Sequence, residues 1–353
     1  MNALSLDTVV LSKDRTALEI LDQTLLPNEI RVLRLSELGE IWEAIRSLRV
    51  RGAPAIGVCA GYAMALEASR TETDDRGVFL AAFRKAKDYL ATSRPTAVNL
   101  FWALDRMERV VAGHPELTVS EWKERLFSEA DAIREEDIAI SRSIGRLGLG
   151  LLRHGDGILT HCNAGTLATA KYGTATAPIY AALEEGWDDL RVYCDETRPL
   201  LQGARLTAFE MQTAGVNTTL LCDNAASALM SSGKIDIIFV GCDRVARNGD
   251  TANKIGTSAV AILAKHYGIP FYVCAPSSTI DMSIPDGAAI PIEQRPGEEV
   301  TEMWYERRMA PEGVNVFNPA FDVTDRSLIT GIITERGICR APFEPAFRAL
   351  GIK

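Results

Sequence analysis

The sequence predicts an α/β protein, with a mostly helical N-terminal domain carrying a small sheet and then a domain built on a doubly wound parallel sheet. The chain has 353 residues, which suits about two domains. Helical periodicity dominates its first third, whereas short β-branched runs alternate with helical runs after Gly155. Such alternation is typical of βαβ units, so the second domain is expected to hold a parallel sheet.

The N-terminal domain is expected over residues 1–118. Strand-like runs at residues 8–34 predict its small sheet. From Ser36, which is placed to cap a helix, apolar residues recur at helical spacing. Further helices are expected at residues 57–70, 76–91 and 97–112.

A long connecting helix is expected over residues 119–153, because Thr118 and Glu121 have capping-box spacing before a long apolar pattern. The second domain then covers residues 154–353. Its expected strands are residues 157–162, 190–194, 217–222, 235–242 and 269–274. Helices are expected between them near residues 166–184, 203–214, 224–231 and 254–267.

The composition excludes several classes of protein. With 38 Lys and Arg against 47 Asp and Glu, the net charge of -9 argues against a nucleic-acid surface, although it leaves room for a small basic pocket. No stretch approaches the roughly 18 apolar residues of a membrane helix, and the N-terminus lacks the layout of a signal peptide. We therefore expect a cytoplasmic protein without membrane contact. Seven cysteines without a C-x-x-C pair predict neither a disulfide framework nor a metal site.

Five cysteines close the five expected strands, and polar residues follow each of them: Cys162, Cys194, Cys222, Cys242 and Cys274. Ligands of open parallel sheets bind at the carboxyl ends of the strands, so this edge is the expected site. Taken singly, each cysteine suits a buried strand end. Cys162 differs, since Asn163 to Gly165 form a turn into an expected helix whose N–H groups would lower the thiol pKa. Both interpretations, core residue and reactive thiolate, are open for Cys162.

Asp243 directly follows the apolar strand that ends in Cys242. Desolvation at the rim of the sheet would raise its pKa and suit a general acid. The alternatives are a helix N-cap or a salt bridge to Arg244 or Arg247.

Three cations stand near expected helix starts, where backbone N–H groups favour an anion: Arg51, Arg94 and Lys254. This pattern suits a small phosphorylated ligand better than a polyanion. Neither a Walker P-loop nor a G-x-G-x-x-G motif after the first strand of the second domain is present. Nucleotide hydrolases and dinucleotide-dependent dehydrogenases are therefore unsupported.

Six motifs together resemble the methylthioribose-1-phosphate isomerase family. They are Arg51 to Gly57 (RGAPAIG), Arg94 to Leu100 (RPTAVNL), Thr160 to Thr169 (THCNAGTLAT), Asp195 to Met211 (DETRPLLQGARLTAFEM), Asp223 to Ala226 (DNAA) and Gly241 to Thr257 (GCDRVARNGDTANKIGT). The wider superfamily includes ribose-1,5-bisphosphate isomerases and regulatory subunits of the translation-initiation guanine-nucleotide exchange factor.

The resemblance implies a Rossmann-like C-terminal domain, a homodimer and a place in methionine salvage and biosynthesis. The family's reaction converts 5-methylthio-α-D-ribose 1-phosphate to 5-methylthio-D-ribulose 1-phosphate, with no organic cofactor and no required metal. The resemblance places the catalytic cysteine at Cys162 and the proton-donating aspartate at Asp243. It places substrate contacts at Arg51, Gly52, Ala53, Arg94, Gln202, Asn253 and Lys254, and leaves Cys194, Cys222 and Cys242 as core residues.

An aldose phosphorylated at C1 cannot open spontaneously, so Asp243 is expected to protonate the ring oxygen. Cys162 is expected either to remove the C2 proton or to stabilise a cationic intermediate of a hydride shift, and Gln202 to bind the sugar hydroxyls. One rival is a non-catalytic regulatory subunit, which generally lacks the Cys and Asp pair. Another is an isomerase of a different C1-phosphorylated pentose such as ribose 1,5-bisphosphate. Phe101 and Trp102 suit either an apolar methylthio slot or a helix core.

Overall fold

The computed structural model describes residues 7–95 and 97–353. The first six residues, part of the stretch tested for an export signal, and Thr96 of the Arg94 to Leu100 motif lie outside the described residues. The chain divides into two compact units. We call residues 7–139 with Thr166–Gly173 the N-terminal unit, and residues 140–165 with 174–353 the C-terminal unit. The division falls within the long helix α5 (Val119–Leu149).

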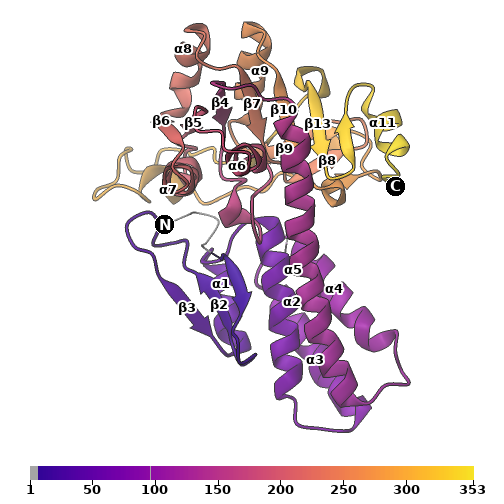
Figure 1. Ribbon diagram of the computed structural model, residues 1–353. Coiled ribbons are helices and arrows are strands. Elements are labelled where there is room, and N and C mark those ends of the chain that lie inside the picture. Colours follow the sequence, from indigo (N-terminus) through magenta and orange to yellow (C-terminus); the bar gives the residue numbers. More distant parts are fainter. Residues whose placement is uncertain (1–6, 96) are drawn as a thin grey trace. The chain divides into compact units, whose positions relative to one another are not determined.

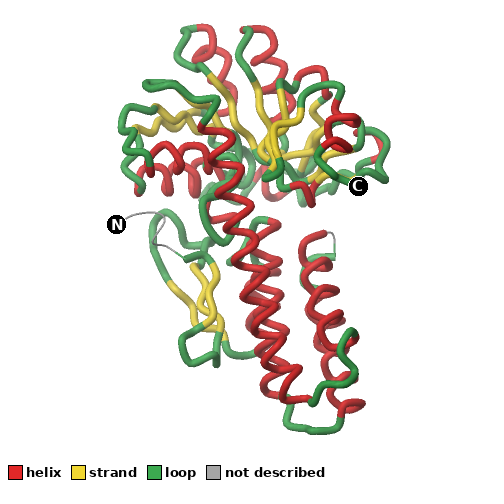
Figure 2. The backbone as a smooth tube through the Cα atoms, turned by 45° about the vertical axis from the view of Figure 1, so that its right-hand side comes forward, coloured by secondary structure: helices red, strands yellow, loops and turns green. Residues whose placement is uncertain are grey.

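The N-terminal unit combines a small antiparallel sheet with a helical bundle (Figure 2). The sheet has the order β1 (Val9–Leu11), β2 (Leu18–Leu21), β3 (Val32–Leu35). The helices are α1 (Leu38–Arg46), α2 (Ala53–Arg70), α3 (Arg76–Ala91), α4 (Val98–Ala112) and the first part of α5. Helix α2 contacts α1, α3 and α4, and it is buried along most of its length because small and apolar residues surround it.

The start of α1 differs from the expectation that Ser36 caps it. Glu37 is the N-cap, and it forms a capping box with Glu40. The Glu40 carboxylate accepts hydrogen bonds from the backbone N–H groups of Ser36 (2.8 Å) and Glu37 (3.0 Å). The reciprocal carboxylates satisfy the first N–H groups of the helix, so the serine hydroxyl is not needed.

The C-terminal unit is built on a seven-stranded sheet in the order β14-β13-β10-β7-β4-β5-β6 (Figure 1). Five strands lie where the sequence predicts them: β4 (Gly157–Thr160), β5 (Arg191–Asp195), β6 (Asn217–Leu221), β7 (Ile237–Val240) and β10 (Phe271–Cys274). Strand β13 (Gly331–Thr334) continues the parallel sheet, and β14 (Gly337–Cys339) closes it as an antiparallel edge. The prediction of an α/β fold with a doubly wound parallel sheet is confirmed.

Helices cover both faces of this sheet (Figure 1). Helices α8 (Ala226–Ser231) and α9 (Thr257–Tyr267) lie on one side, and α6 (Ala177–Glu184) and α7 (Ala208–Thr213) lie on the other. The apolar core on the first side also takes in α11 (Phe343–Ala349), whose Phe343 and Phe347 are buried. The short helix α10 (Glu298–Thr301) lies between β10 and the later strand β12 (Phe321–Thr324).

A second, four-stranded sheet stands beside the carboxyl end of β7 in the order β11-β8-β9-β12. Its strands are β8 (Arg244–Ala246), β9 (Thr251–Lys254), β11 (Ile280–Asp281) and β12 (Phe321–Thr324). Strands β8 and β9 form an antiparallel hairpin in which Arg244 lies opposite Ala252. This hairpin carries the chain from the end of β7 to the start of α9.

The prediction of a helix at residues 166–184 is wrong for the first part of this range. Thr166–Ala168 form only a short 3-10 turn, and α6 begins at Ala177. The carbonyl of Ala164 accepts hydrogen bonds from the N–H groups of Thr174 (2.8 Å) and Ala175 (3.0 Å). These bonds fold residues 165–173 into a closed loop, and a continuous helix is incompatible with them.

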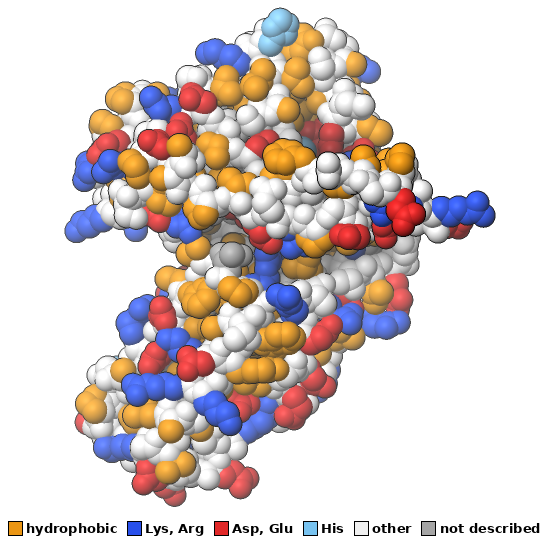
Figure 3. Space-filling view, turned by 180° about the vertical axis from the view of Figure 1, so that it is seen from behind, with side chains coloured by type: hydrophobic (Ala, Val, Ile, Leu, Met, Phe, Trp, Pro, Cys, Tyr) orange, Lys and Arg blue, Asp and Glu red, His pale blue; other side chains and the backbone are white. Residues whose placement is uncertain are grey.

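Among the described residues, no helix has the length and apolar character that crossing a membrane requires. On the face shown in Figure 3, basic and acidic side chains are interspersed with apolar ones.

Candidate active site

The strand order predicts a candidate site beyond the carboxyl ends of β4 and β7. The chain runs from β4 outwards to β5 and β6, and it then returns to β7 on the other side of β4. Both neighbours of β4 are parallel to it, with Ile158 opposite Ile237 and Leu159 opposite Ile238. In open α/β sheets such a reversal opens a crevice beyond the carboxyl ends of the two strands. Cys162 follows β4 there, and Asp243 follows β7.

The segments that carry these two residues are in contact. Gly241 lies at the end of β7, and a Cβ at this position would come within 2.5 Å of the Cβ of Ala164. A glycine is therefore required for the two segments to approach this closely. The contact brings the loop after Cys162 against the turn before Asp243.

Cys162 has an unusual backbone conformation, with a φ of 66°. This left-handed region is unfavourable for a residue with a Cβ, at a cost of about 1–3 kcal/mol. Two threonines hold it, because the Cys162 N–H donates to Thr197 Oγ1 (2.8 Å) and the Cys162 carbonyl accepts from Thr207 Oγ1 (2.6 Å). A partly exposed residue on a strained turn does not fit the interpretation of Cys162 as a buried core residue, and it makes Cys162 a candidate for a functional role.

The expectation that a helix N-terminus activates this thiol is wrong. The segment after Cys162 is a loop, and the first helix beyond it starts at Ala177. The aligned peptide dipoles of a long helix are therefore not available at this turn.

Asp243 directly precedes β8, and the residue is exposed. Its backbone N–H donates to the carbonyl of Ala252 (3.0 Å), which ties it to the β8–β9 hairpin. The expectation that burial at the sheet rim desolvates this carboxyl is wrong. Of the neighbouring arginines, Arg244 pairs with Asp281 (2.6 Å) and Arg247 lies 3.7 Å from Glu344.

The same hairpin presents Asn253 and Lys254 at the end of β9. Lys254 was expected at a helix start, but α9 begins only at Thr257, because Gly256 takes a left-handed φ of 102°. The Lys254 ammonium donates to the carbonyl of Ala320 (3.0 Å) and lies 4.5 Å from the ring centre of Phe321. Asn253 is buried, and its Nδ2 donates to Thr257 Oγ1 (3.1 Å).

Gln202 precedes the π-helical turn η3 (Gly203–Thr207), which leads into α7. Its side chain is buried, and its Oε1 has no hydrogen-bond partner among the described residues. A buried amide oxygen without a partner is costly, so it suits a hydroxyl group of a ligand.

The other four expected contact residues belong to the N-terminal unit. Arg51 is half-buried and precedes Gly52, which has a φ of 88° and caps α2, so that Ala53 is the first helical residue. A Cβ on Gly52 would lie 2.4 Å from the carbonyl oxygen of Ala168. Free N–H groups at such a helix start favour an anion. Arg94, also half-buried, stands before α4.

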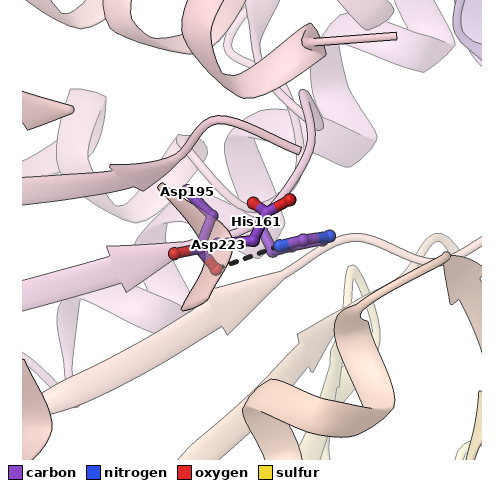
Figure 4. Close-up of side chains that lie close together, drawn as sticks. All are labelled: His161, Asp195 and Asp223. Atoms are coloured by element: carbon purple, nitrogen blue, oxygen red, sulfur yellow. Dashed lines mark hydrogen bonds and ion pairs between the residues drawn. The ribbon is translucent and has the colours of Figure 1, made fainter. Parts of the chain in front are cut away.

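A buried polar cluster at the strand ends was not predicted. His161 precedes Cys162, and its ring lies beside the carboxylates of Asp195 and Asp223 (Figure 4). One ligand-type atom from each of the three lies within 4.8 Å of the others. His161 Nδ1 is 3.0 Å from Asp195 Oδ2, and Nε2 is 2.9 Å from the carbonyl oxygen of Ile255. Because an acceptor oxygen lies near each ring nitrogen, the ring is better suited to donate hydrogen bonds than to bind a metal ion. The sequence did contain a signal for this cluster, namely acidic residues at the ends of adjacent strands.

The strand-end cysteines differ among themselves. Cys194 and Cys274 are buried, and burial raises the pKa of both thiols. Cys222 is exposed, so its expected place in the core is wrong. It follows the edge strand β6, where no further strand covers it. Cys242 is partly exposed, with its Sγ 3.4 Å from Thr279 Oγ1.

Comparisons with known proteins first identify the class to which this chain belongs. Residues 49–341 match the model of the initiation factor 2 subunit family. Methylthioribose-1-phosphate isomerase of Symbiobacterium thermophilum is 62% identical, over 98% of this chain and 96% of its own. The 5-deoxyribose 1-phosphate isomerase of Petrotoga mobilis is 53% identical, over 97% and 98% of the two chains.

Among solved structures, 5-methylthioribose 1-phosphate isomerase of Pyrococcus horikoshii OT3 has a TM-score of 0.94 and 44% identity, covering 99% of this chain and 97% of its own. Subunit delta of translation initiation factor eIF-2B from A. fulgidus has a TM-score of 0.90 and 40% identity, covering 98% and 100%. The chain therefore belongs to the initiation factor 2 subunit family and, within it, to the methylthioribose-1-phosphate isomerase family. It is an aldose–ketose isomerase.

Proposed function

We propose that this isomerase converts 5-methylthio-α-D-ribose 1-phosphate to 5-methylthio-D-ribulose 1-phosphate, the reaction expected in methionine salvage. The observation that supports the proposal most is that Cys162 and Asp243 follow the neighbouring strands β4 and β7, where the strand order reverses. One side chain suits a base and the other an acid, and they follow neighbouring strands. The 62% identity to an isomerase named for this substrate points the same way.

In the proposed reaction Asp243 protonates the ring oxygen as the bond between C1 and that oxygen breaks. The Asp243 carboxyl is exposed before substrate binds. A bound phosphate sugar would remove it from water and add nearby negative charge, and both effects favour the protonated acid. Asp243 later recovers its proton from the C2 hydroxyl as the ketone forms, so the acid is regenerated in each cycle.

Cys162 acts on the hydrogen that leaves C2. In one route its thiolate takes the C2 proton, an enediol-type intermediate forms, and the same proton or a solvent proton is added at C1. In the other route the hydrogen moves as hydride from C2 to a cationic C1, and Cys162 stabilises that cation. In each route, a positioned proton-transfer group contributes about 100- to 10,000-fold to the rate. Solvent deuterium at C1 of the product would support the first route, and its absence would support the second.

Binding residues hold the ligand for this chemistry. We assign phosphate recognition to Arg51, Arg94 and Lys254, together with backbone groups at Gly52 and Ala53, because guanidinium groups and helix N-termini favour phosphate oxygens. In the C-terminal unit, Gln202 and Asn253 offer buried amides for the sugar hydroxyls. The unpaired Oε1 of Gln202 is the group with most to gain from a ligand.

A second candidate substrate is 5-deoxyribose 1-phosphate, because relatives at 53% identity carry that name. The two sugars differ only at C5, by a methylthio group against hydrogen. An isomerase of ribose 1,5-bisphosphate would need a second anion site. A non-catalytic regulatory role, suggested by the eIF-2B-like neighbour, would leave Cys162 and Asp243 without a function.

The test is turnover by the purified protein. Methylthioribose 1-phosphate, 5-deoxyribose 1-phosphate and ribose 1,5-bisphosphate are supplied separately, and ketose formation is followed by NMR. We expect the highest kcat/KM with methylthioribose 1-phosphate. Higher kcat/KM with either rival would reassign the substrate, and no turnover of any of the three would overturn the enzymatic role.

The proposal includes a homodimer that works without cofactor, as the resemblance implies. Light scattering of the purified protein gives its mass in solution. Turnover after exhaustive treatment with a metal chelator tests whether the enzyme works without a metal cofactor.

A further inference from the structure

The buried ring of His161 has an acceptor at each nitrogen. Only 1% of the residue is exposed, and the ring lies between Asp195 Oδ2 at 3.0 Å and the carbonyl oxygen of Ile255 at 2.9 Å. A carbonyl oxygen accepts only, so Nε2 carries a proton. The proton between Nδ1 and Asp195 is shared by the pair, and its place decides whether the ring is charged.

Three carboxylates from three elements interact electrostatically with this ring. Asp195 ends β5, Asp223 follows β6, and Asp322 lies in β12. Burial disfavours a charged ring, but the hydrogen bond and charge of Asp195, with further help from Asp223, outweigh it, so the pKa of His161 is raised. Burial also raises the pKa of Asp195. The shared proton nevertheless belongs on the ring, because imidazole is the stronger base and a second carboxylate stands nearby.

The ring joins two segments of the site that are far apart in the sequence. His161 is covalently next to Cys162 on one side. On the other side it holds Ile255, which directly follows Lys254. The Ile255 segment is also anchored from behind, since Asp322 accepts the N–H groups of Gly256 (2.8 Å) and Ser258 (3.1 Å).

The fit between the ring and this segment is tight. Gly256 has a φ of 102°, and a Cβ at that position would lie 2.8 Å from His161 Cε1. Only glycine lets the backbone pass the ring at this distance. The position of Ile255, and with it the end of β9, therefore depends on the ring.

We propose that His161 is a positioning residue, an imidazolium that ties the Cys162 turn to the Asn253–Lys254 strand end and holds the base and the phosphate-binding lysine in one rigid frame. The proposal rests on the function proposed above. Loss of the ring should free the Ile255 carbonyl and let Lys254 shift, which weakens substrate binding. It should also loosen the strained Cys162 turn, which slows the chemical step.

Two substitutions distinguish the effect of the His161 ring, which connects the two segments, from the effect of its positive charge. His161→Gln removes the ring and leaves a neutral amide that cannot reach both acceptors in the same geometry. Asp195→Asn keeps the ring, since the new amide donates to Nδ1 while Nε2–H still donates to Ile255, but the ring becomes neutral. We expect His161→Gln to raise KM at least about 10-fold and to lower kcat about 10-fold, and Asp195→Asn to leave KM within about 3-fold of the wild type.

The charge of the His161 ring is measured separately, by NMR of its ring nitrogens. In ¹⁵N-histidine-labelled wild type, both ring nitrogens of His161 should be protonated at about pH 7, whereas Asp195→Asn should show one unprotonated ring nitrogen. A neutral ring in the wild type would overturn the assignment of an imidazolium.

If circular dichroism shows that His161→Gln does not fold, Gly256→Ala replaces it. The new Cβ pushes the ring away from Ile255 without removing any polar group, so the same rise in KM is expected.

The outcomes distinguish this proposal from the function itself. Wild-type turnover together with an unchanged KM in His161→Gln or Gly256→Ala overturns the positioning role and leaves the function standing. If the wild type turns over none of the sugar phosphates, the function fails, and binding of inorganic phosphate then decides the positioning role. Weaker phosphate binding in the variants supports it, and equal binding overturns it.

Discussion

Thr207 Oγ1 donates a hydrogen bond of 2.6 Å to the carbonyl oxygen of Cys162. The bond joins the π-helical turn before α7 to a cysteine whose φ is 66°. Thr207 is buried, and it also accepts a hydrogen bond from Asn163 Nδ2 at 3.1 Å. A single hydroxyl thus holds both Cys162 and its neighbour, and this predicts that a residue outside the substrate-binding set controls the cysteine.

Thr207→Val should therefore lower activity without changing the shape of the side chain much. The variant leaves the Cys162 carbonyl without its donor, at a cost of about 1–3 kcal/mol, so we expect kcat to fall about 10- to 100-fold. Steady-state kinetics with methylthioribose 1-phosphate measures it. Thr207→Ser is the matched control, because it keeps the hydroxyl and should stay within about 3-fold of wild type. Equal loss in both variants would point to packing instead of the hydrogen bond.

Cys162→Ser and Asp243→Asn should each lose nearly all turnover while keeping the fold and the affinity for ligand. Each change removes a proton-transfer group of nearly the same size, so we expect kcat to fall about 100- to 10,000-fold. Ketose formation followed by NMR gives the rate, and calorimetric titration with the substrate gives the affinity. Retained activity in either variant would remove that residue from its proposed role. Cys222→Ser, at an exposed cysteine after β6, is the control and should be fully active.

Gly241→Ala should disturb the relation between the segments that carry Cys162 and Asp243. The new Cβ would come within 2.5 Å of Ala164, so the Cys162 loop must move away from the Asp243 turn. A displacement of about 1 Å can cost about 100-fold in rate, and overpacking typically destabilises by about 1–3 kcal/mol.

A glycine in α1 supplies the control for this prediction. Gly39→Ala meets only the Tyr89 hydroxyl at 3.9 Å. It should leave kcat unchanged and stabilise the helix by up to about 1 kcal/mol. Activity and thermal unfolding of both variants check the pair. An active Gly241→Ala would show that the two segments do not need their close contact.

Stability of the N-terminal unit should fall as pH rises through the titration of Asp137. Burial raises the pKa of this carboxyl to about 7, although the Ala170 N–H, 2.6 Å from Oδ2, and the charge of Arg134 act in the opposite direction. Between about pH 4 and about pH 7 the folded chain holds a proton that the unfolded chain has lost. The free energy of unfolding therefore decreases with pH across this window, by at most about 4 kcal/mol.

Thermal unfolding at about pH 5 and about pH 8 tests the prediction for Asp137. Asp137→Asn cannot ionise, so the difference in Tm between the two conditions should be smaller than in the wild type. Asp88→Asn, at an exposed position of α3, serves as the control and should behave like the wild type. An unchanged pH dependence in Asp137→Asn would assign the effect to other groups.

Much of the fold could be predicted because its signals are local. The alternation of β-branched and helical runs located five strands of the main sheet, and helical periodicity located α3 and α4 to within about two residues. Polar residues that follow strands can likewise be recognised in the sequence, so Cys162 and Asp243 are candidates on the sequence alone. These features depend on neighbours a few residues away, and the order of residues alone determined them.

The tertiary structure decided how those pieces meet. Nothing local determines that β7 returns beside β4, yet this order brings the Cys162 turn to the Asp243 turn. The loop after Cys162 is held by hydrogen bonds from Thr174 and Ala175 rather than by helical propensity. His161 and Asp195 pair across 34 residues of sequence, and His161 reaches Ile255 across 94. Such contacts form only when distant segments are packed together, so the sequence identified the candidate residues and packing determined the frame that holds them.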